Sequence, residues 1–414
     1  MSRAADVARA AGRLARTRTK NAEVGRRRVL IVKPSLLPPG GGETVAAWMI
    51  EALKDAYDVA LVSWTRSDFK RVNEAYATSI RDEDIEMYTV ARPIRLAIDS
   101  LPTRAALLKW SVLVRLARRV SRPSDLLISA ENEADFGRRA IQYVHYPRQL
   151  RPRPREDMRW YHRPEALLDL YYAFCDRLVG FSLDGVRRNL SLANSEWTAV
   201  RTRAFRPGTE LVVLPPPVTG GFPDVPWDRR ANGFVCVGRF APEKELEKVV
   251  AILDDVRRQV PGVELHLVGG RESRAYYRRV TQLVRRHHPW VHLHEGLSWQ
   301  DLRTMIASQR YGIHGMREEH FGIAPAEMVR GGCIVFVPDG GGQVEIVGRD
   351  DRLLYATRAD AVKKIVTVMT DAREQASLRA FLYARADLFS ADRFVGTFRR
   401  LVAAFEARER RGAA

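Results

Sequence analysis

The sequence predicts an α/β protein built from two Rossmann-like, doubly wound domains that face each other across a cleft. Three observations support this. A strand, a glycine cluster, a helix and a second strand follow one another in residues 29–62, and the pattern restarts at Phe234. Residues 215–232 between the two halves are rich in Pro, Gly and Asp, which is typical of a linker. The 414 residues are enough for two full hydrophobic cores.

These observations divide the chain into five segments. They are a basic N-terminal tail at 1–28, a first Rossmann-like domain at 29–214, the linker at 215–232, a second Rossmann-like domain at 233–390, and a C-terminal helical segment at 391–414 expected to pack back on the first domain.

The first unit begins with the apolar run at 29–32, which is typical of a buried parallel strand. The glycines at 40–42 follow, then a helix predicted over 44–57 and a strand over 59–62. Adjacent glycines let the backbone approach a ligand closely, although a plain tight turn uses them as well. Because the fingerprint G-x-G-x-x-G is absent, the unit does not indicate a dinucleotide cofactor.

The rest of the first half continues the alternation of strands and helices. Strands are predicted over 86–90, 126–129, 140–144 and 211–214, with a helix from 165 onward and a helix cap at Ser195. His145 comes just after a buried strand, where binding sites occur in this architecture, although a lone histidine is more often structural.

The second half repeats the scheme. Strands are predicted over 234–237, 264–268 and 291–293, and helices over 245–259, 273–288, 299–308 and 391–408. Arg239 and Lys244 follow the first of these strands and flank a helix start. Two cations at such a place would hold a diphosphate, although a surface charge pair is the commoner role of Arg and Lys.

The stretch 312–345 carries the densest set of signals. Glu319 and Glu327 are separated by seven residues, and we expect Pro325 to be the first helical residue, which places Glu327 in the first turn. Free N–H groups at 322–324 would make an anion site. A helix stop at Gly331 and Gly332, a strand over 334–337 and the glycines at 340–342 complete the unit.

Composition restricts the partners and the compartment. The formal net charge of +18 indicates an anionic partner, such as nucleic acid, acidic lipid headgroups or a phosphorylated substrate. The 1–28 tail is a candidate for an anionic membrane surface, and a solvated tail is the alternative. Cys175, Cys236 and Cys333 have no metal-like spacing and indicate a reducing compartment. No apolar run is long enough to span a bilayer.

Several ordered motifs resemble family-4 retaining glycosyltransferases of GT-B fold, in particular the branch that transfers mannose onto dolichol-linked oligosaccharides. The stretch Gly-Ile-His-Gly-Met-Arg-Glu-Glu-His-Phe-Gly-Ile at 312–323 is the most similar. Further matches are the segments 40–43, 143–147, 194–198, 214–216, 240–244 and 267–270. The resemblance covers about residues 29–400.

The resemblance implies roles for individual residues. Glu319 would lie near the donor sugar and Glu327 on the ribose, Arg239 and Lys244 would bind the donor diphosphate, and His145 would lie near the reacting sugar. The other residues implied at the donor are Gly41, Gly42, Phe321, Gly322 and Ile323. The implied reaction is transfer of a hexose, mannose or glucose, from a nucleotide-diphospho-sugar to a glycan or lipid-linked acceptor, with retention and without a metal or other cofactor.

Two departures from the family pattern leave donor and acceptor open. They are Arg317 and the run Arg148-Gln149-Leu150-Arg151 after Pro147. The alternatives are another GT-B enzyme, such as a sugar-nucleotide 2-epimerase or an inverting transferase, and a basic nucleic-acid-binding protein. The scattered arginines form no recognised nucleic-acid motif, so no nucleic-acid partner is expected. The expected location is cytoplasmic, peripheral on the inner face of the membrane.

Overall fold

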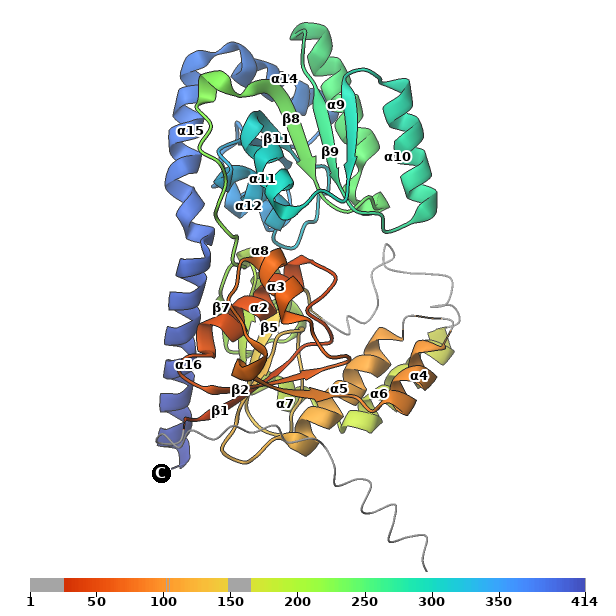
Figure 1. Ribbon diagram of the computed structural model, residues 1–414, viewed down its shortest axis with the longest axis vertical. Coiled ribbons are helices and arrows are strands. Elements are labelled where there is room, and N and C mark those ends of the chain that lie inside the picture. Colours follow the sequence, from red (N-terminus) through yellow and green to blue (C-terminus); the bar gives the residue numbers. More distant parts are fainter. Residues whose placement is uncertain (1–25, 102, 104, 148–164, 414) are drawn as a thin grey trace, which may run out of the picture.

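A computed structural model describes residues 26–101, 103, 105–147 and 165–413, and it contains two α/β units, one above the other (Figure 1). The lower unit has a seven-stranded sheet in the order β3-β2-β1-β4-β5-β6-β7, and the upper a six-stranded sheet in the order β10-β9-β8-β11-β12-β13. The paired strands run parallel. Each sheet starts in its middle and grows toward both edges, which is the doubly wound pattern. The predicted fold class is confirmed.

The elements of the lower unit alternate along the chain. Its strands are β1 (Arg28–Val32), β2 (Asp58–Ser63), β3 (Ile85–Thr89), β4 (Leu126–Ser129), β5 (Ile141–Val144), β6 (Leu190–Ala193) and β7 (Leu211–Val213). Its helices are α2 (Gly41–Leu53), α3 (Phe69–Tyr76), α4 (Arg92–Asp99), α5 (Ala106–Val120), α6 (Glu165–Val179), α7 (Leu183–Arg187) and α8 (Glu196–Phe205).

The upper unit continues the alternation. Its strands are β8 (Ala231–Val237), β9 (Leu265–Gly269), β10 (Val291–Glu295), β11 (Gln309–Ile313), β12 (Ile334–Pro338) and β13 (Leu354–Tyr355). Its helices are α9 (Leu246–Gln259), α10 (Arg274–Arg286), α11 (Trp299–Ser308), α12 (Ile323–Arg330), α13 (Gln343–Ile346), α14 (Arg358–Thr370) and α15 (Ala372–Ala386), and α16 (Ala391–Ala413) follows.

The central strand β1 is buried on both faces, which explains its unbroken apolar run. Val29 and Ile31 belong to the cluster that includes α2 and α16, whereas Leu30 and Val32 belong to the cluster that includes α5. Side chains alternate across a strand, so a strand covered by helices on both sides needs apolar residues at every position.

Helix α16 returns from the upper unit and runs along the lower one, at the left of Figure 1. Phe394, Phe398, Val402 and Phe405 form one apolar face, and they are buried in the same core as α2. The Arg399 side chain also donates a hydrogen bond of 2.6 Å to the carbonyl of Ala52. The core of the lower unit therefore includes residues more than 300 positions away in the chain.

The structure corrects several predicted boundaries. Helix α2 begins at Gly41 rather than residue 44, so the glycine cluster starts a helix instead of forming a loop. Pro325 is the third residue of α12, where its missing N–H is still outside the helical hydrogen bonds, and Glu327 therefore lies in the second turn rather than the first. Strand β8 begins at Ala231, inside the predicted linker.

Other elements were not predicted at all, or lie outside the described residues. Strand β11 and helices α14 and α15 were not predicted, and α16 extends to Ala413 instead of ending at 408. Most of the basic tail at 1–28 and the arginine-rich segment at 148–155 lie outside the described residues. Within the described part of the chain, none of the helices is both long and apolar enough to cross a membrane.

We expect Phe398→Ala to destabilise the lower unit although the residue belongs to the last helix. The side chain is fully buried, and truncating a buried Phe costs about 3–5 kcal/mol. Urea unfolding followed by fluorescence measures the loss. Tyr383→Ala on α15, where the side chain is 85% exposed, is the control and should leave the midpoint unchanged. Equal midpoints for both variants would show that α16 does not support this core.

Candidate active site

The carboxylate of Glu319 is the centre of a small polar cluster in the upper unit. It lies in the loop between β11 and α12, and its Oε2 forms an ion pair with Lys244 Nζ and a 3.1 Å hydrogen bond with His314 Nε2. Among the described hydrogen bonds and ion pairs, none uses Oε1 of this carboxylate. One oxygen is thus fixed in place, and the other can accept a hydrogen bond from a ligand.

Glu319 is ionised, whereas His314 is neutral. Burial opposes ionisation of Glu319, but the Lys244 charge and the His314 hydrogen bond hold its pKa well below the usual range. Burial lowers the pKa of His314, against the effect of Glu319. His314 is therefore neutral at physiological pH and donates its Nε2–H to an ionised Glu319.

Glu327 is also buried, but its surroundings stabilise a negative charge much less than those of Glu319. It is 7% exposed on α12, and burial raises the pKa of its carboxyl to about 8, with Arg303 acting in the other direction. None of the described hydrogen bonds or ion pairs involves its carboxyl group. The two glutamates, alike in sequence, therefore differ in protonation state at neutral pH.

Arg239 lies on the surface beside this cluster. Its guanidinium is 61% exposed, forms an ion pair with Glu272 and lies 3.7 Å from Glu243. Lys244 is only 13% exposed. A diphosphate bound by both cations would have to compete with Glu272 for Arg239.

The lower unit contributes a second polar cluster at the carboxyl edge of its sheet. A Cβ on Gly42 would lie 3.0 Å from Lys33 Nζ and 3.4 Å from His145 Nε2. Lys33 is buried and forms ion pairs with Glu131 and Glu43, the latter at 3.1 Å. Although burial works against the charge, these carboxylates raise the pKa of Lys33. Gly42 therefore lets the start of α2 approach Lys33 and His145 closely.

The two clusters meet where the units touch. A Cβ on Gly41 would lie 2.7 Å from Ile323 Cδ1 of the upper unit, so glycine permits this close approach. The ring of Tyr146, the residue after His145, stacks at 4.2 Å on the ring of His320, the residue after Glu319. His145 and Glu319 are thus each one residue from the same contact. The structure brings together six predicted residues, namely Gly41, Gly42, His145, Lys244, Glu319 and Ile323.

Other predicted site features are placed differently. The ring of Phe321 is buried in the upper core and packs edge-on against Phe389 at 5.6 Å, so its side chain faces away from the site. Gly322 caps α12 with φ +105°, a conformation that favours glycine. The glycines at 340–342 face the backbone of 317–321 rather than an open cleft, and Gly342 N–H donates to the Glu319 carbonyl at 2.7 Å.

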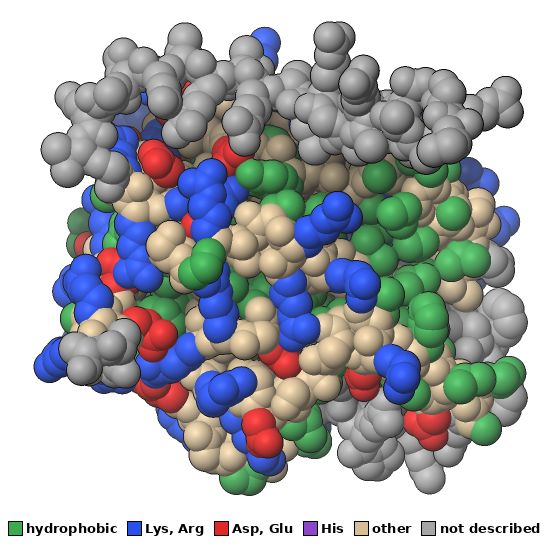
Figure 2. Space-filling view, turned by 90° about the horizontal axis from the view of Figure 1, so that it is seen from below, with side chains coloured by type: hydrophobic (Ala, Val, Ile, Leu, Met, Phe, Trp, Pro, Cys, Tyr) green, Lys and Arg blue, Asp and Glu red, His purple; other side chains and the backbone are tan. Residues whose placement is uncertain are grey.

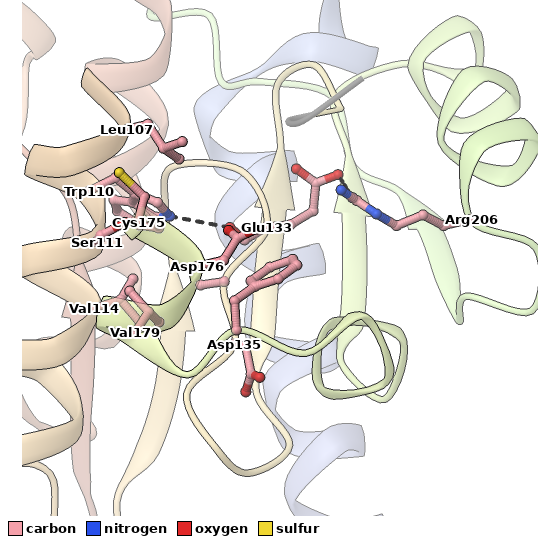
Figure 3. Close-up of a pocket in the computed structure, with 12 residues that line it drawn as sticks. Leu107, Trp110, Ser111, Val114, Glu133, Asp135, Cys175, Asp176, Val179 and Arg206 are labelled. Carbon is pink, nitrogen blue, oxygen red and sulfur yellow. Dashed lines mark hydrogen bonds and ion pairs between the residues drawn. The ribbon is translucent and has the colours of Figure 1, made fainter. Parts of the chain in front are cut away.

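A cavity between α5 and α6 lies apart from these residues (Figure 3). Its volume is about 20 Å³, enough for a single water molecule and far below that of a sugar-nucleotide pocket. In Figure 3 the side chains of Glu133 and Arg206 point toward one another, and they form a buried ion pair. The cavity is therefore part of the core rather than a candidate site.

Comparison with known proteins finds a family model that is similar to the upper unit. Residues 222–384 match the family model described as "Glycosyl transferases group 1". This segment is therefore similar to group 1 glycosyltransferase domains. It contains Arg239, Lys244, Glu319 and Glu327, so one half of the candidate site lies inside the matched region.

The curated relatives and solved structures agree with this domain. The chain is 26% identical over 249 residues to the human protein named GDP-Man:Man(3)GlcNAc(2)-PP-Dol alpha-1,2-mannosyltransferase, and 25% identical over 257 residues to the Dictyostelium discoideum protein of that name. Each alignment covers 55% of this chain. The chain spans about half the length of these relatives, 50% and 49%.

Two solved structures match almost the whole chain. Anabaena HepE with UDP and glucose has a TM-score of 0.61 and 16% identity, covering 91% of this chain and 99% of that one. Sucrose-phosphate synthase from Thermosynechococcus elongatus has a TM-score of 0.67 and 15% identity, covering 92% and 100%. At these identities the likeness shows the fold, which is GT-B.

The sequence analysis did not identify two polar residues of the site, one inside the matched region 222–384 and one in the lower unit. Within the domain it missed His314, which accompanies Glu319. In the lower unit it missed Lys33, although a charged residue directly after the apolar run at 29–32 is a readable signal. An Asp-x-Asp triplet, Asp82–Asp84, lies directly before the amino end of β3, whereas the candidate site lies at the carboxyl ends of the strands. Asp84 forms an ion pair with Arg81.

The raised pKa of Glu327 predicts a specific pH dependence of stability. The folded chain keeps a proton that the unfolded chain releases between about pH 4.5 and pH 8, so this group stabilises the fold at low pH and the contribution is lost as pH rises through that range. The slope for one proton is at most about 1.4 kcal/mol per pH unit. Glu327→Gln, which stays neutral, should remove this slope.

Urea unfolding midpoints of wild type and Glu327→Gln at about pH 5 and about pH 8 measure the effect. The exposed Glu318→Gln is the matched control and should keep the wild-type slope. An identical slope in Glu327→Gln would mean that Glu327 is already ionised at neutral pH.

Proposed function

We propose that this protein is a retaining, metal-independent glycosyltransferase that moves a hexose from a nucleotide-diphospho-sugar to a hydroxyl of a glycan or lipid-linked acceptor. The observation that carries the proposal is the ionised Glu319, held by Lys244 and His314 and next in the chain to His320, whose ring stacks on Tyr146 of the lower unit. The match of residues 222–384 to a group 1 glycosyltransferase domain supports the same reaction class.

Mannose is the favoured sugar and GDP the favoured nucleotide, because the curated relatives are named as enzymes that use GDP-Man. Glucose carried on UDP is the second candidate, since Anabaena HepE was solved with UDP and glucose. For the acceptor, the relatives' names specify a dolichol-linked oligosaccharide, which supports a lipid-linked glycan here.

In the proposed reaction the bond between the sugar C1 and the diphosphate oxygen breaks, and a bond from C1 to the acceptor oxygen forms on the same face. The acceptor proton passes to the departing diphosphate. Lys244 has three N–H donors, so it can keep Glu319 and still bind a phosphate oxygen. Arg239 would stabilise the diphosphate charge after leaving Glu272.

The other residues would position the sugar. Oε1 of Glu319 would accept a hydrogen bond from a sugar hydroxyl, and Glu327 would bind the ribose. The free N–H groups at the start of α12, behind the Gly322 cap, would face the donor phosphate. From the lower unit, His145 and the start of α2 at Gly41 and Gly42 would face the reacting sugar.

Removing the Lys244 charge should lower kcat strongly while the chain stays folded. Losing one group that stabilises developing charge typically costs about 10²–10³-fold in kcat. We expect this from Lys244→Ala, and a comparable loss from Glu319→Gln and Arg239→Ala. The assay is release of nucleoside diphosphate with acceptor present. Matched controls are Lys248→Ala, whose partly buried ion pair is with Glu245, and Glu318→Gln, whose exposed ion pair is with Arg201.

Full activity in all three site variants would refute this assignment. Thermal melting of each variant checks that the chain is folded, and the rise in melting temperature with GDP-mannose, UDP-glucose and their diphosphates identifies the nucleotide. A sugar-nucleotide 2-epimerase would instead convert the donor into its epimer without any acceptor.

A lipid-linked acceptor requires contact with a membrane, and the lower unit has a surface suited to it. Leu167, Leu170 and Phe174 form an exposed stripe on α6, with exposed fractions of 63%, 68% and 56%. On α4, Ile94 and Leu96 are also exposed. These five side chains are named here the α4–α6 patch. Both helices contact α5. Lys109 of α5 forms an ion pair of 2.6 Å with Asp99 of α4, and the Leu108 N–H of α5 donates a hydrogen bond of 3.0 Å to the Tyr171 hydroxyl of α6.

The charge around the α4–α6 patch suits anionic lipid. Seen from below, hydrophobic side chains gather toward the right of the lower unit, the side on which α4, α5 and α6 lie in Figure 1, with Lys and Arg among them (Figure 2). Exposed Leu and Phe beside basic residues are the composition of surfaces that lie in a bilayer interface. We therefore propose peripheral binding to the inner face of a membrane through this patch, with the 1–28 tail as a second contact.

Replacing patch leucines by aspartate should reduce membrane binding. Each buried Leu contributes about 1.5–3 kcal/mol, so Leu96→Asp/Leu170→Asp should lower partitioning by well over tenfold. Flotation with vesicles containing anionic lipid measures it, alongside a truncation lacking residues 1–28. Tyr383→Asp on the upper unit is the matched control. If the patch variant floats like wild type while the truncation does not, the tail alone binds the membrane.

A further inference from the structure

Three histidines and a glutamate gather on one face of the upper sheet, at its edge and outside the candidate active site. His266 lies in β9, and His292 and His294 lie in β10. Glu264 directly precedes β9. Side chains alternate along a strand, so residues two apart share a face, and the parallel register pairs His292 with His266. All four side chains therefore project from the same side of two neighbouring strands.

The ligand atoms of three of these residues converge. Glu264 Oε2 lies 3.5 Å from His292 Nε2 and 3.9 Å from His266 Nε2, and one ligand atom from each of the three residues lies within 4.8 Å of the others. The rings of His266 and His292 are stacked at 4.8 Å. In a tetrahedral zinc site, with metal–ligand bonds near 2.0–2.1 Å, ligand atoms are about 3.3 Å apart. The separations from Glu264 Oε2 to the Nε2 atoms of His292 and His266 exceed this by about 0.2 Å and about 0.6 Å.

The fourth residue orients the ring of His266. His266 Nδ1 and His294 Nε2 are 3.0 Å apart, a hydrogen-bond distance. If Nδ1 carries the proton, the lone pair of His266 lies on Nε2 and faces Glu264 and His292. A ligating histidine commonly holds its second nitrogen in such a bond. Nε2 of His292 is buried, and it has no hydrogen-bond partner among the described residues.

The cluster has features that a plain surface group of histidines lacks. The exposed fraction of the side chain is 13% for His266 and 37% for His292, so both rings are partly buried. Neutral imidazoles with one carboxylate form a donor set that late divalent transition metals prefer. β10 is the edge strand of the sheet, with β9 as its partner, so an ion bound here would join the edge strand to its neighbour.

We propose that Glu264, His266 and His292 bind a divalent transition-metal ion of the zinc class, with His294 as the positioning residue for His266. The ligands would be Glu264 Oε2 and the Nε2 atoms of His266 and His292, with water completing the coordination. The ion has no part in the proposed sugar transfer. It would stabilise the edge of the upper sheet.

Calorimetric titration of Zn²⁺ into the full chain, after treatment with a chelator and desalting, tests the proposal. We expect one saturable equivalent. His266→Ala and His292→Ala should each weaken binding at least about tenfold, and loss of the positioning residue in His294→Ala should weaken it about 10–100-fold. The exposed Glu264→Gln tests the carboxylate without a risk to folding. His288→Ala, an exposed histidine outside the cluster, is the matched control and should bind as wild type does.

A second readout separates this site from adventitious binding. Zn²⁺ should raise the melting temperature of wild type and His288→Ala but not of His266→Ala. The visible absorption of bound Co²⁺ should show tetrahedral coordination in wild type only when His266 and His292 are intact. Absence of saturable binding in wild type, or equal binding in wild type, His266→Ala and His292→Ala, would overturn the proposal. Neither outcome bears on the glycosyltransferase assays, which need no added metal.

Discussion

The carboxylate of Glu345 accepts two hydrogen bonds of 3.0 Å from the backbone N–H groups of Glu196 and Trp197, and it does so across the boundary between the two units. The first N–H groups of a helix have no partner within the helix, so α8 needs acceptors from elsewhere. Ser195 caps Thr198 from within the lower unit, and α13 of the upper unit supplies the other acceptor. The start of α8 is therefore completed only when the two units are together.

The geometry of the candidate site depends on this contact. Ser195 Oγ donates a hydrogen bond of 2.6 Å to the carbonyl of His320, whose ring stacks on the rings of both Tyr146 and Trp197. His145 and Glu319, each next to a stacked residue, belong to different units, so their separation depends on how the two units are held together. The hydrogen bonds of Glu345 to the start of α8 and the stack of Tyr146 on His320 set the separation of His145 and Glu319. A small shift of α8 would move His145 relative to the Lys244–Glu319 pair, which is anchored separately in the upper unit.

The fold could be predicted from patterns within short stretches of the sequence, whereas the protonation states of the site residues could not. The apolar run at 29–32 and the restart at Phe234 were enough to predict two parallel sheets, because a strand buried on both faces needs such a run. Burial is set by residues far apart in the chain, and this is why the protonation difference between Glu319 and Glu327 could not be read from their spacing. Lys244 and His314 compensate the buried charge of Glu319, and Glu327 has no such partners. The same limit explains Phe321, which looked like a donor contact and packs on Phe389 instead.

Two chain segments cross between the units side by side, joined by a bridge between Val218 and Ser390 with a 2.8 Å hydrogen bond from Val218 N–H to the Phe389 carbonyl. Beyond Ser390, α16 is fixed to the lower unit by its buried phenylalanines. Any rotation of one unit against the other must therefore bend the paired segments together. Among the described residues, the contacts between the units near the site include hydrogen bonds, the ring stack and the Arg201–Glu318 ion pair at 3.0 Å, and contacts of this kind are weaker than the buried α16 face. If the two units move apart, the hydrogen bonds of Glu345 to the start of α8 and the Tyr146–His320 stack should break first. The contacts expected to break first therefore lie beside the candidate site, and the buried face of α16 keeps the two units connected.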